Sequence, residues 1–472
     1  MSSPRTTAIA AAAAWFDAGS LLDELRRRIA YRTESQDAAS GTALASYLTD
    51  EIGPSVARCG FDWSIWTNPV PGAPPLLFAE RCEDRALPTV LIYGHGDVVA
   101  GYDAQWTNGR SPWELSVENG KWYGRGTADN KGQHTINLAA LAQVIASRGR
   151  LGFNAKLLLE MGEEVGSPGL RTTCERDAEA LRADVLIASD GPRLRAASPT
   201  IFLGSRGVFN FDLSVSLREG AHHSGNWGGL LANPGTILAN AISALVDARG
   251  RILVDALRPA SVPATVRSAL EGIEPGEPGG PAIDPDWGEP ALSPAERVFA
   301  WNALEVLAFR TGNPERPVNA IPPRATAHLQ LRFVAGCDWH QFIPALRAHL
   351  DARGLTMVHV QQATTEPMEA TRLDPADPWV SWASESIAAT VGRPPAILPN
   401  LGGALPNDCF AEVLGLPTIW VPHSYPACSQ HAPNEHMLSA VAREGLQIMT
   451  GLFWDLGETG IPRRRPTVQG RI

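Results

Sequence analysis

Cysteine is scarce in this sequence, and no two cysteines form a CxxC pair. Six cysteines are spread over 472 residues, at Cys59, Cys82, Cys174, Cys337, Cys409 and Cys428. A disulfide framework needs paired cysteines and an oxidising compartment. The scattered pattern therefore favours reduced thiols in a cytoplasmic protein.

Long apolar runs and an excess of positive charge are also absent. No run of about 18 strongly apolar residues occurs, so we expect no membrane span. The net charge is −10, and phosphates would be repelled by such a field, which argues against nucleic-acid or membrane-surface partners. The N-terminal segment "MSSPRTTAIAAAAAWFDAG" has one Arg and an Ala-rich run. It predicts the start of a helix rather than a signal peptide.

What the sequence does contain is an alternation of strands and helices. Apolar runs predict strands at 86–94, 154–162 and 183–191, and helical spacing predicts helices at 21–30 and 135–147. Strands and helices in turn are typical of an α/β fold, with a mostly parallel sheet and helices on both faces. At roughly 150 residues per domain, the length suggests two or three domains.

The pattern of apolar and polar residues changes near residue 205, and the earlier pattern returns near residue 367. Residues 207–219 and 325–334 alternate apolar and polar side chains, as half-exposed antiparallel strands do, and helices are predicted at 234–249 and 338–354. The Pro- and Gly-rich stretch 271–294 predicts a surface loop. We therefore expect an α+β domain at 205–366 inserted into an α/β domain made of 1–204 and 367–472.

Polar side chains follow the predicted strands of the α/β domain, where ligands of such sheets bind. They are His95 and Asp97 in "LIYGHGDVV", Glu163 and Glu164 in "LLLEMGEEV", Asp190, and His431 in "SQHAPNEH", with Asp129 in a glycine-rich turn before a helix. Clustered carboxylates repel one another and are costly to desolvate. Divalent cations resolve that conflict, and imidazole with carboxylate suits a dinuclear zinc site. Asp97 is expected to orient His95 rather than bind metal.

Each of these residues also has an ordinary interpretation when taken alone. An Asp after a strand is commonly a helix cap or a turn residue. "GRGTADNKG" resembles a phosphate-binding loop, but Lys131 lacks the following Ser or Thr. The prediction of a metal site rests on the joint occurrence of these residues at successive strand ends.

With these segments in order, the sequence resembles the dinuclear-zinc metallopeptidases. That family includes carnosine and other dipeptidases, glutamate carboxypeptidase, aminoacylase, acetylornithine deacetylase and succinyl-diaminopimelate desuccinylase. The matching segments span nearly the whole chain: "GHGDVV", "KWYGRGTADNKG", "EMGEEVGSPG", "SDG", "HHSGNWGG", "NAIPPRATAHLQLRFV" and "QHAPNEHM".

The resemblance implies a role for each matching residue. His95 and Asp190 hold one zinc ion, Glu164 and His431 hold the other, and Asp129 bridges the two. Glu163 is the general base that takes a proton from the zinc-activated water. Two zinc ions per subunit are expected, with Co²⁺ or Mn²⁺ as possible substitutes.

The inserted domain carries further implied site residues. His223 in "HHSG" corresponds to a lid histidine that reaches into the partner subunit of a homodimer and stabilises the oxyanion. Asn319, Arg332 and Gly403 correspond to substrate-binding positions, and Arg332 suits a free carboxylate. The dipeptidase branch has serine where "LGGALPNDC" has Ala404, and threonine where this chain has Asn319.

We therefore expect a zinc-dependent amide hydrolase that removes a C-terminal amino acid or cleaves a dipeptide. An N-acyl-amino-acid deacylase is the alternative, and a non-catalytic ligand-binding member is a third. A small peptide or N-acyl amino acid is the expected partner, with no nucleic acid and no membrane.

Overall fold

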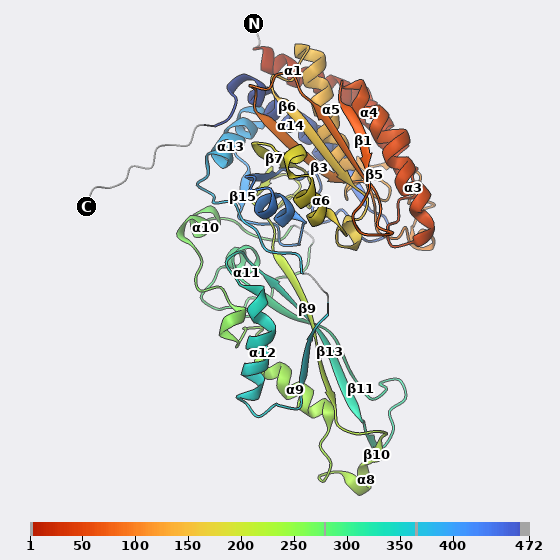
Figure 1. Cartoon of the computed structure of the whole chain (residues 1–472), viewed down its shortest axis with the longest axis vertical. Coiled ribbons are helices and arrows are strands. Elements are labelled where there is room, and N and C mark those ends of the chain that lie inside the picture. Colours follow the sequence, from red (N-terminus) through yellow and green to blue (C-terminus); the bar gives the residue numbers. More distant parts are fainter. Residues whose placement is uncertain (1–2, 278–279, 364–366, 463–472) are drawn as a thin grey trace, which may run out of the picture.

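A mixed eight-stranded sheet lies in the larger of the two parts of the described structure (Figure 1). The computed structural model describes residues 3–277, 280–363 and 367–462. The order of the strands across this sheet is β1 (Asp62–Trp66), β2 (Leu76–Arg81), β6 (Asn154–Glu160), β3 (Thr89–His95), β7 (Val185–Ala188), β16 (Thr418–Trp420), β8 (Thr200–Phe202) and β15 (Ala396–Leu398). The central strands β6, β3, β7 and β16 run parallel, which confirms the predicted α/β sheet.

Alternate side chains of the central strand β3 enter two separate apolar cores. Val90 and Ile92 join a core on one face, and Leu91 and Tyr93 join a core on the other. This burial on both sides explains why β3 is a continuous apolar run rather than an alternating one.

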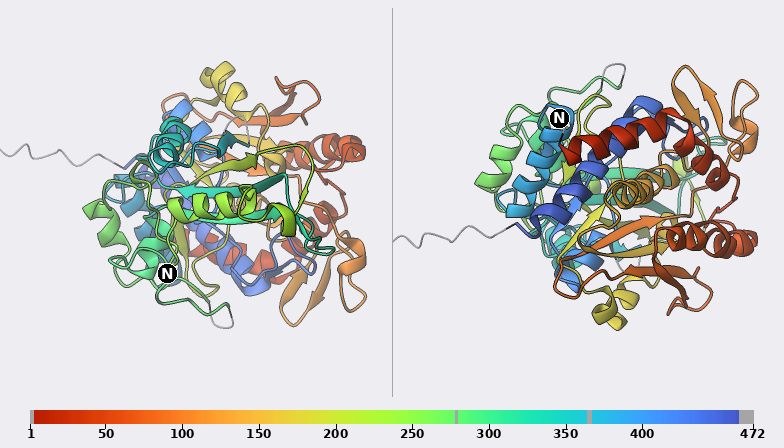
Figure 2. Two further views of the ribbon diagram at one scale, coloured as in Figure 1. Left: turned by 90° about the horizontal axis from the view of Figure 1, so that it is seen from below. Right: turned by 90° about the horizontal axis from the view of Figure 1, so that it is seen from above.

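Helices cover both faces of this sheet. On one face α1 (Pro4–Asp17), α5 (Lys131–Arg148) and α14 (Ser439–Thr459) lie side by side, as the view from above shows (Figure 2, right). The other helices of this part are α2 (Ser20–Ile29), α3 (Gly41–Ser46), α4 (Gly53–Arg58), α6 (Leu170–Arg176), α7 (Ala178–Leu181) and α13 (Pro378–Val391). Of the helices in the described ranges, none combines the length and apolar character needed to cross a membrane.

The strands of a four-stranded antiparallel sheet come, in the sequence, between the two chain segments that build the larger sheet. Its order is β11 (Ala303–Thr311), β13 (Arg324–Phe333), β9 (Gly207–Ser216) and β14 (His359–Gln362). Strand β9 alternates buried and half-buried residues along its length, as its sequence predicts. Helices α9 (Pro234–Leu245) and α12 (Phe342–Asp351) complete the core on its buried face.

Shorter elements complete the described chain. They are the strands β4 (Ser116–Glu118), β5 (Lys121–Tyr123) and β17 (His436–Leu438), the pair β10 (His222–His223) and β12 (Ala320–Ile321), and the helices α8 (Ser224–Trp227), α10 (Ala264–Ala269) and α11 (Pro294–Phe299). The Pro- and Gly-rich stretch is mostly exposed, with Ile283 and Trp287 at the surface. It is not only a surface loop, however, because Pro275 and Gly276 line a cavity that Asp129 and Asp190 also line.

Candidate metal centre

The carboxyl ends of the parallel strands bring five polar side chains to one edge of the large sheet. Strand β3 ends at His95, and β6 is followed by a single helical turn that carries Glu163 and Glu164. Asp190 follows β7, and the loop after β16 carries His431. Parallel strands place their carboxyl ends together, which is why residues so distant in sequence meet here.

Asp129 lies at the centre of this group, just before α5. His95 Nε2 is 3.0 Å from Asp129 Oδ1 and 3.4 Å from Asp190 Oδ2. His431 Nε2 is 2.9 Å from the other oxygen of Asp129 and 3.1 Å from Glu164 Oε2. Two three-residue groups therefore share Asp129, and the ligand atoms within each group lie within 4.8 Å of one another.

The protonation of these groups shows how strongly the site attracts positive charge. Burial raises the pKa of Glu163 well above its usual value, and burial with the neighbouring Asp129 raises the pKa of Glu164 to about 7. Hydrogen bonds to Asp129 and Glu164 raise the pKa of His431 to about 11. Burial opposes the charge on His95, but hydrogen bonds to Asp129, Asp190 and Asp97 raise its pKa well above the usual range. These raised pKa values indicate that the site stabilises added positive charge.

The donor atoms fit divalent metal ions. Imidazole nitrogen and carboxylate oxygen are ligands of zinc, and one carboxylate can serve two ions. Glu164 Oε1 is buried and has no hydrogen-bond partner among the described residues. An unpartnered buried carboxylate oxygen is costly, and a cation between Glu164 and its neighbours removes that cost.

Asp97 connects the two halves of the cluster. Its carboxylate lies 3.3 Å from Nδ1 of His95, whose shorter contact, at 3.1 Å, is to the backbone carbonyl of Asp97. The same carboxylate accepts hydrogen bonds from the backbone N–H of Glu163 and Glu164, at 3.2 and 3.1 Å. Asp97 thus contacts both His95 and the turn that follows β6.

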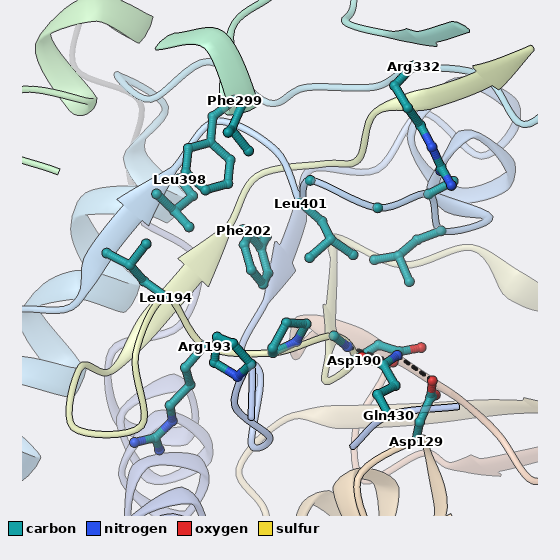
Figure 3. Close-up of a pocket in the computed structure, with 18 of the residues that line it drawn as sticks. Asp129, Asp190, Arg193, Leu194, Phe202, Phe299, Arg332, Leu398, Leu401 and Gln430 are labelled. Atoms are coloured by element: carbon teal, nitrogen blue, oxygen red, sulfur yellow. Dashed lines mark hydrogen bonds between the residues drawn. The ribbon is translucent and has the colours of Figure 1, made fainter. Parts of the chain in front are cut away.

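A cavity of about 590 Å³ opens beside the cluster. Asp129 and Asp190 lie at one end of it (Figure 3), and Glu163 and His431 also line it. The remaining walls include two predicted substrate-binding residues, Arg332 and Gly403. The structure therefore places most of the predicted site residues around one space.

His223 and Asn319 lie elsewhere. They are on or next to the small β10–β12 pair, where the N–H of Ser224 donates to the carbonyl of Asn319 at 2.9 Å. This pair and α8 lie at the tip of the molecule farthest from the large sheet (Figure 1). Neither residue lines the cavity of its own chain.

Three residues near the cluster were not predicted as part of the site. Gln430 donates to Asp129, and Glu435 accepts hydrogen bonds from the backbone of the loop that carries Asp129. Arg206 donates to the carbonyl of Gly402, and burial together with Arg332 lowers the pKa of Arg206 to about 10. Only the closeness of Gln430 and Glu435 to His431 in the sequence offered a signal for any of them.

Known proteins resemble this chain in sequence and in fold. Residues 91–455 match the profile of peptidase family M20/M25/M40. A cysteinylglycine-S-conjugate dipeptidase of Corynebacterium striatum is 28% identical over 328 residues, which cover 68% of this chain and 70% of that enzyme. The Beta-Ala-His dipeptidase of Mus musculus is 35% identical over 195 residues, 41% of this chain but only 39% of that enzyme.

Solved structures share the fold over nearly the whole chain. The dipeptidase Dug1p from Saccharomyces cerevisiae superposes with a TM-score of 0.78 at 20% identity, covering 96% of this chain and 99% of that one. The metallo-carboxypeptidase Sso-CP2 from Sulfolobus solfataricus superposes with a TM-score of 0.76 at 24% identity, covering 92% and 98%.

Proposed function

The chain belongs to peptidase family M20/M25/M40 and is a hydrolase, and from this premise we propose that it is a dinuclear metallodipeptidase. The observation that carries the proposal is the pair of three-residue groups that share Asp129. The names of its relatives, which are dipeptidases acting on cysteinylglycine conjugates and on Beta-Ala-His, support a dipeptide as the substrate.

Two metal ions occupy the cluster in this proposal. His95 and Asp190 hold one ion, Glu164 and His431 hold the other, and Asp129 binds both. Zinc suits these donors, although nitrogen and oxygen ligands also accept Co²⁺ or Mn²⁺. When bound, the ions polarise the scissile carbonyl and make a water molecule more acidic.

Glu163 moves the proton in this mechanism. Its carboxylate lines the cavity next to Asp129 and Asp190, where an attacking water must lie. Glu163 takes the proton from that water and delivers it to the leaving amine nitrogen, so that the amide C–N bond breaks. Burial raises the affinity of Glu163 for this proton, which suits a base that must also act as an acid.

A second copy of the chain completes the site. The side chain of His223 is exposed, and its Nδ1 accepts the N–H of Gly225, so that Nε2 is the ring nitrogen that carries the proton in the neutral imidazole. Strand β11 is an edge strand that exposes Val306, Leu307 and Phe309, at 41%, 54% and 44%. Such an apolar edge suits pairing with another chain. The homodimer would bring His223 and Asn319 to the partner's cavity, where His223 donates to the developing oxyanion.

The carboxylate of the substrate binds at the opposite wall. Arg332 donates from Nε to the side-chain oxygen of Gln330 at 2.9 Å, and Arg332 and Gly403 line the same cavity. A guanidinium and peptide N–H groups are suitable donors to a free carboxylate. The six cysteines are free thiols, which supports the cytoplasm as the proposed location.

Metal content and a substrate panel test this function. Purified protein should carry about two metal ions per chain by elemental analysis, and metal-loaded protein should hydrolyse dipeptides faster than N-acetyl or N-succinyl amino acids. Preferential hydrolysis of the N-acyl amino acids would replace the dipeptidase by the deacylase. Failure to hydrolyse either class at saturating metal would refute the proposed activity.

Two variants test the assigned roles. Glu163→Ala should abolish turnover and retain the metal, whereas parallel loss of metal would make Glu163 a ligand. Subunits with His223→Ala, mixed with Glu163→Ala subunits, should recover part of the activity in heterodimers. Absence of recovery in confirmed heterodimers would contradict a role for His223 in the partner's site.

A further inference from the structure

The cavity beside the metal cluster has a second, apolar end. Five apolar side chains that Figure 3 labels form it: Leu194, Phe202, Phe299, Leu398 and Leu401. Val298 also lines the cavity and, like Phe299, lies near Gly402. Arg193 borders this end, but its guanidinium pairs with Glu444 at 2.5 Å and points away from the apolar group in Figure 3. This end therefore offers no unpaired charge to a ligand.

We propose that the apolar end holds the side chain of the substrate's carboxyl-terminal residue. The preferred substrates are then dipeptides that end in a large aliphatic or aromatic residue, rather than in glycine or a polar residue. This inference rests on the proposed dipeptidase function and assigns the substrate class to the same site.

The position of the glycine loop decides which substrate residue faces the apolar end. A Cβ atom added to Gly402 would lie 3.5 Å from Cγ1 of Val298 and 4.0 Å from Cε1 of Phe299. The loop proposed to bind the carboxylate thus runs alongside the apolar wall. A residue whose carboxylate lies at Gly403 and Arg332 has its side chain close to that wall.

The loop is held firmly from behind. The backbone N–H of Arg206 points to the carbonyls of Leu401 and Gly403, both at 3.2 Å, and its Nε donates to the carbonyl of Gly402 at 2.9 Å. The N–H of Leu401 donates to the carbonyl of Gly204 at 2.8 Å. A fixed loop keeps the distance between the carboxylate site and the apolar wall constant, which is what selection by side-chain size needs.

Part of the Pro- and Gly-rich stretch reaches the cavity near Leu194, where Nε of Arg195 donates to the carbonyl of Gly276 at 3.2 Å. Pro275 and Gly276 line the cavity, and Glu277 anchors them. Its two carboxylate oxygens accept the backbone N–H of Ala196 at 3.2 Å and of Ala427 at 3.3 Å. Chain that lines this part of the cavity reduces the contact of a bound apolar side chain with water, which makes its burial favourable.

A dipeptide series measures the preference. Metal-loaded enzyme is assayed on Ala-Gly, Ala-Leu and Ala-Phe, with Leu-Ala and Phe-Ala as reversed controls. Burial of a large apolar side chain predicts a kcat/KM for Ala-Leu and Ala-Phe on the order of 10- to 100-fold above that for Ala-Gly. Equal values across the three, or a preference set by the amino-terminal residue instead, would overturn the inference while leaving the dipeptidase function intact.

A cavity-filling variant tests the site itself. Val298 is half-buried on α11, so Val298→Trp should fill the apolar end and lower kcat/KM for Ala-Phe by about tenfold or more, with Ala-Gly changed by less than about threefold. Val117→Trp, at a 51% exposed position on β4, is the matched control and should change neither substrate. Equal losses on both substrates in Val298→Trp, with an unchanged Tm, would overturn the inference.

Binding of free amino acids gives a measurement that needs no turnover. Metal-loaded Glu163→Ala protein is titrated calorimetrically with phenylalanine, leucine and glycine, which carry the carboxylate of the products. Binding of phenylalanine and leucine that is tighter than binding of glycine, and that is lost when Val298→Trp is added, supports the apolar subsite. This result would stand even if no dipeptide were hydrolysed, because absence of hydrolysis would refute only the proposed function. Equal binding of glycine would refute the subsite.

Discussion

A substitution of Glu435 should most clearly distinguish residues that support the proposed metal centre from residues that bind the metal. One oxygen of this carboxylate accepts the backbone N–H groups of Gly126, Ala128 and Asp129, at 3.0, 2.9 and 3.2 Å. The other oxygen pairs with Arg125 at 2.6 Å, and the exposed fractions of the two side chains are 1% and 0%. The loop that carries the shared ligand Asp129 is therefore held by one buried carboxylate.

The substitution Glu435→Ala leaves the charge of Arg125 buried and uncompensated and removes the acceptor for three N–H groups. Breaking a buried ion pair by removing one partner costs about 3–5 kcal/mol. At about 2–4 °C per kcal/mol for a large domain, Tm should fall by about 6–20 °C. Loss of the support behind a metal ligand should also weaken metal binding by about 10- to 100-fold.

Thermal unfolding in the presence of a chelator measures the stability effect apart from metal binding, and metal titration measures the second effect. Glu458→Ala is the control, because Glu458 is 59% exposed and pairs with Arg148 at 3.1 Å at the surface. An exposed pair contributes at most about 1 kcal/mol, so Tm should change by less than about 4 °C. If Glu435→Ala lowers Tm by no more than this control, the buried pair does not hold the loop as described.

Three further predictions concern acid sensitivity, metal number and assembly. Burial holds the pKa of His423 well below its usual value, so the unfolded state binds a proton that the folded state does not. The free energy of unfolding should therefore fall as the pH drops below about 6.5, by about 1.4 kcal/mol per pH unit. In unfolding measured from pH 7.5 to 5.5, His423→Gln should flatten this dependence, whereas His340→Gln, at an exposed position, should not. Asp190→Asn should reduce the bound metal from about two ions per chain to about one by elemental analysis, since Asp190 belongs to only one of the two groups; unchanged metal content would remove it from the ligands. Leu307→Arg on the exposed edge strand should convert a dimer to a monomer in analytical ultracentrifugation, and Val117→Arg should leave the assembly unchanged.

The sheet and its helices were predictable because each carries a local pattern. The continuous apolar run of β3 is a consequence of burial on both faces of its sheet, and the strict alternation of β9 is a consequence of burial on one face. The last strand of the four-stranded sheet was located less well, since the sequence of residues 355–363 predicts a strand but β14 spans only His359–Gln362. Pairing with β9, which the sequence does not reveal, decides where that strand begins.

The ligand candidates at strand ends were accessible for a topological reason. Once the strands are taken as parallel, His95, Glu164 and Asp190 must lie at one edge, whatever the loops do. The apolar end of the cavity was not accessible in this way. Phe202, Leu398 and Phe299 come from β8, β15 and α11, and any of them reads as ordinary core until the fold places it beside a cavity.

Glu435 shows why the supporting residues escape a search for chemistry. In sequence it is one more carboxylate near His431, and its residue type fits a metal ligand as well as a structural role. In the structure the two residues lie on the same loop and make different contacts. His431 contributes a ring nitrogen to the cluster, and Glu435 accepts the backbone N–H of Asp129, the residue that both three-residue groups share. In this proposal, a metal ion held by His431 and Asp129 would join the loop of residues 424–436 to the segment that carries Asp129, which Glu435 already links by hydrogen bonds. Metal binding and the ordering of residues 424–436 should accordingly be one coupled equilibrium, in which loss of Glu435 weakens a centre that it never touches.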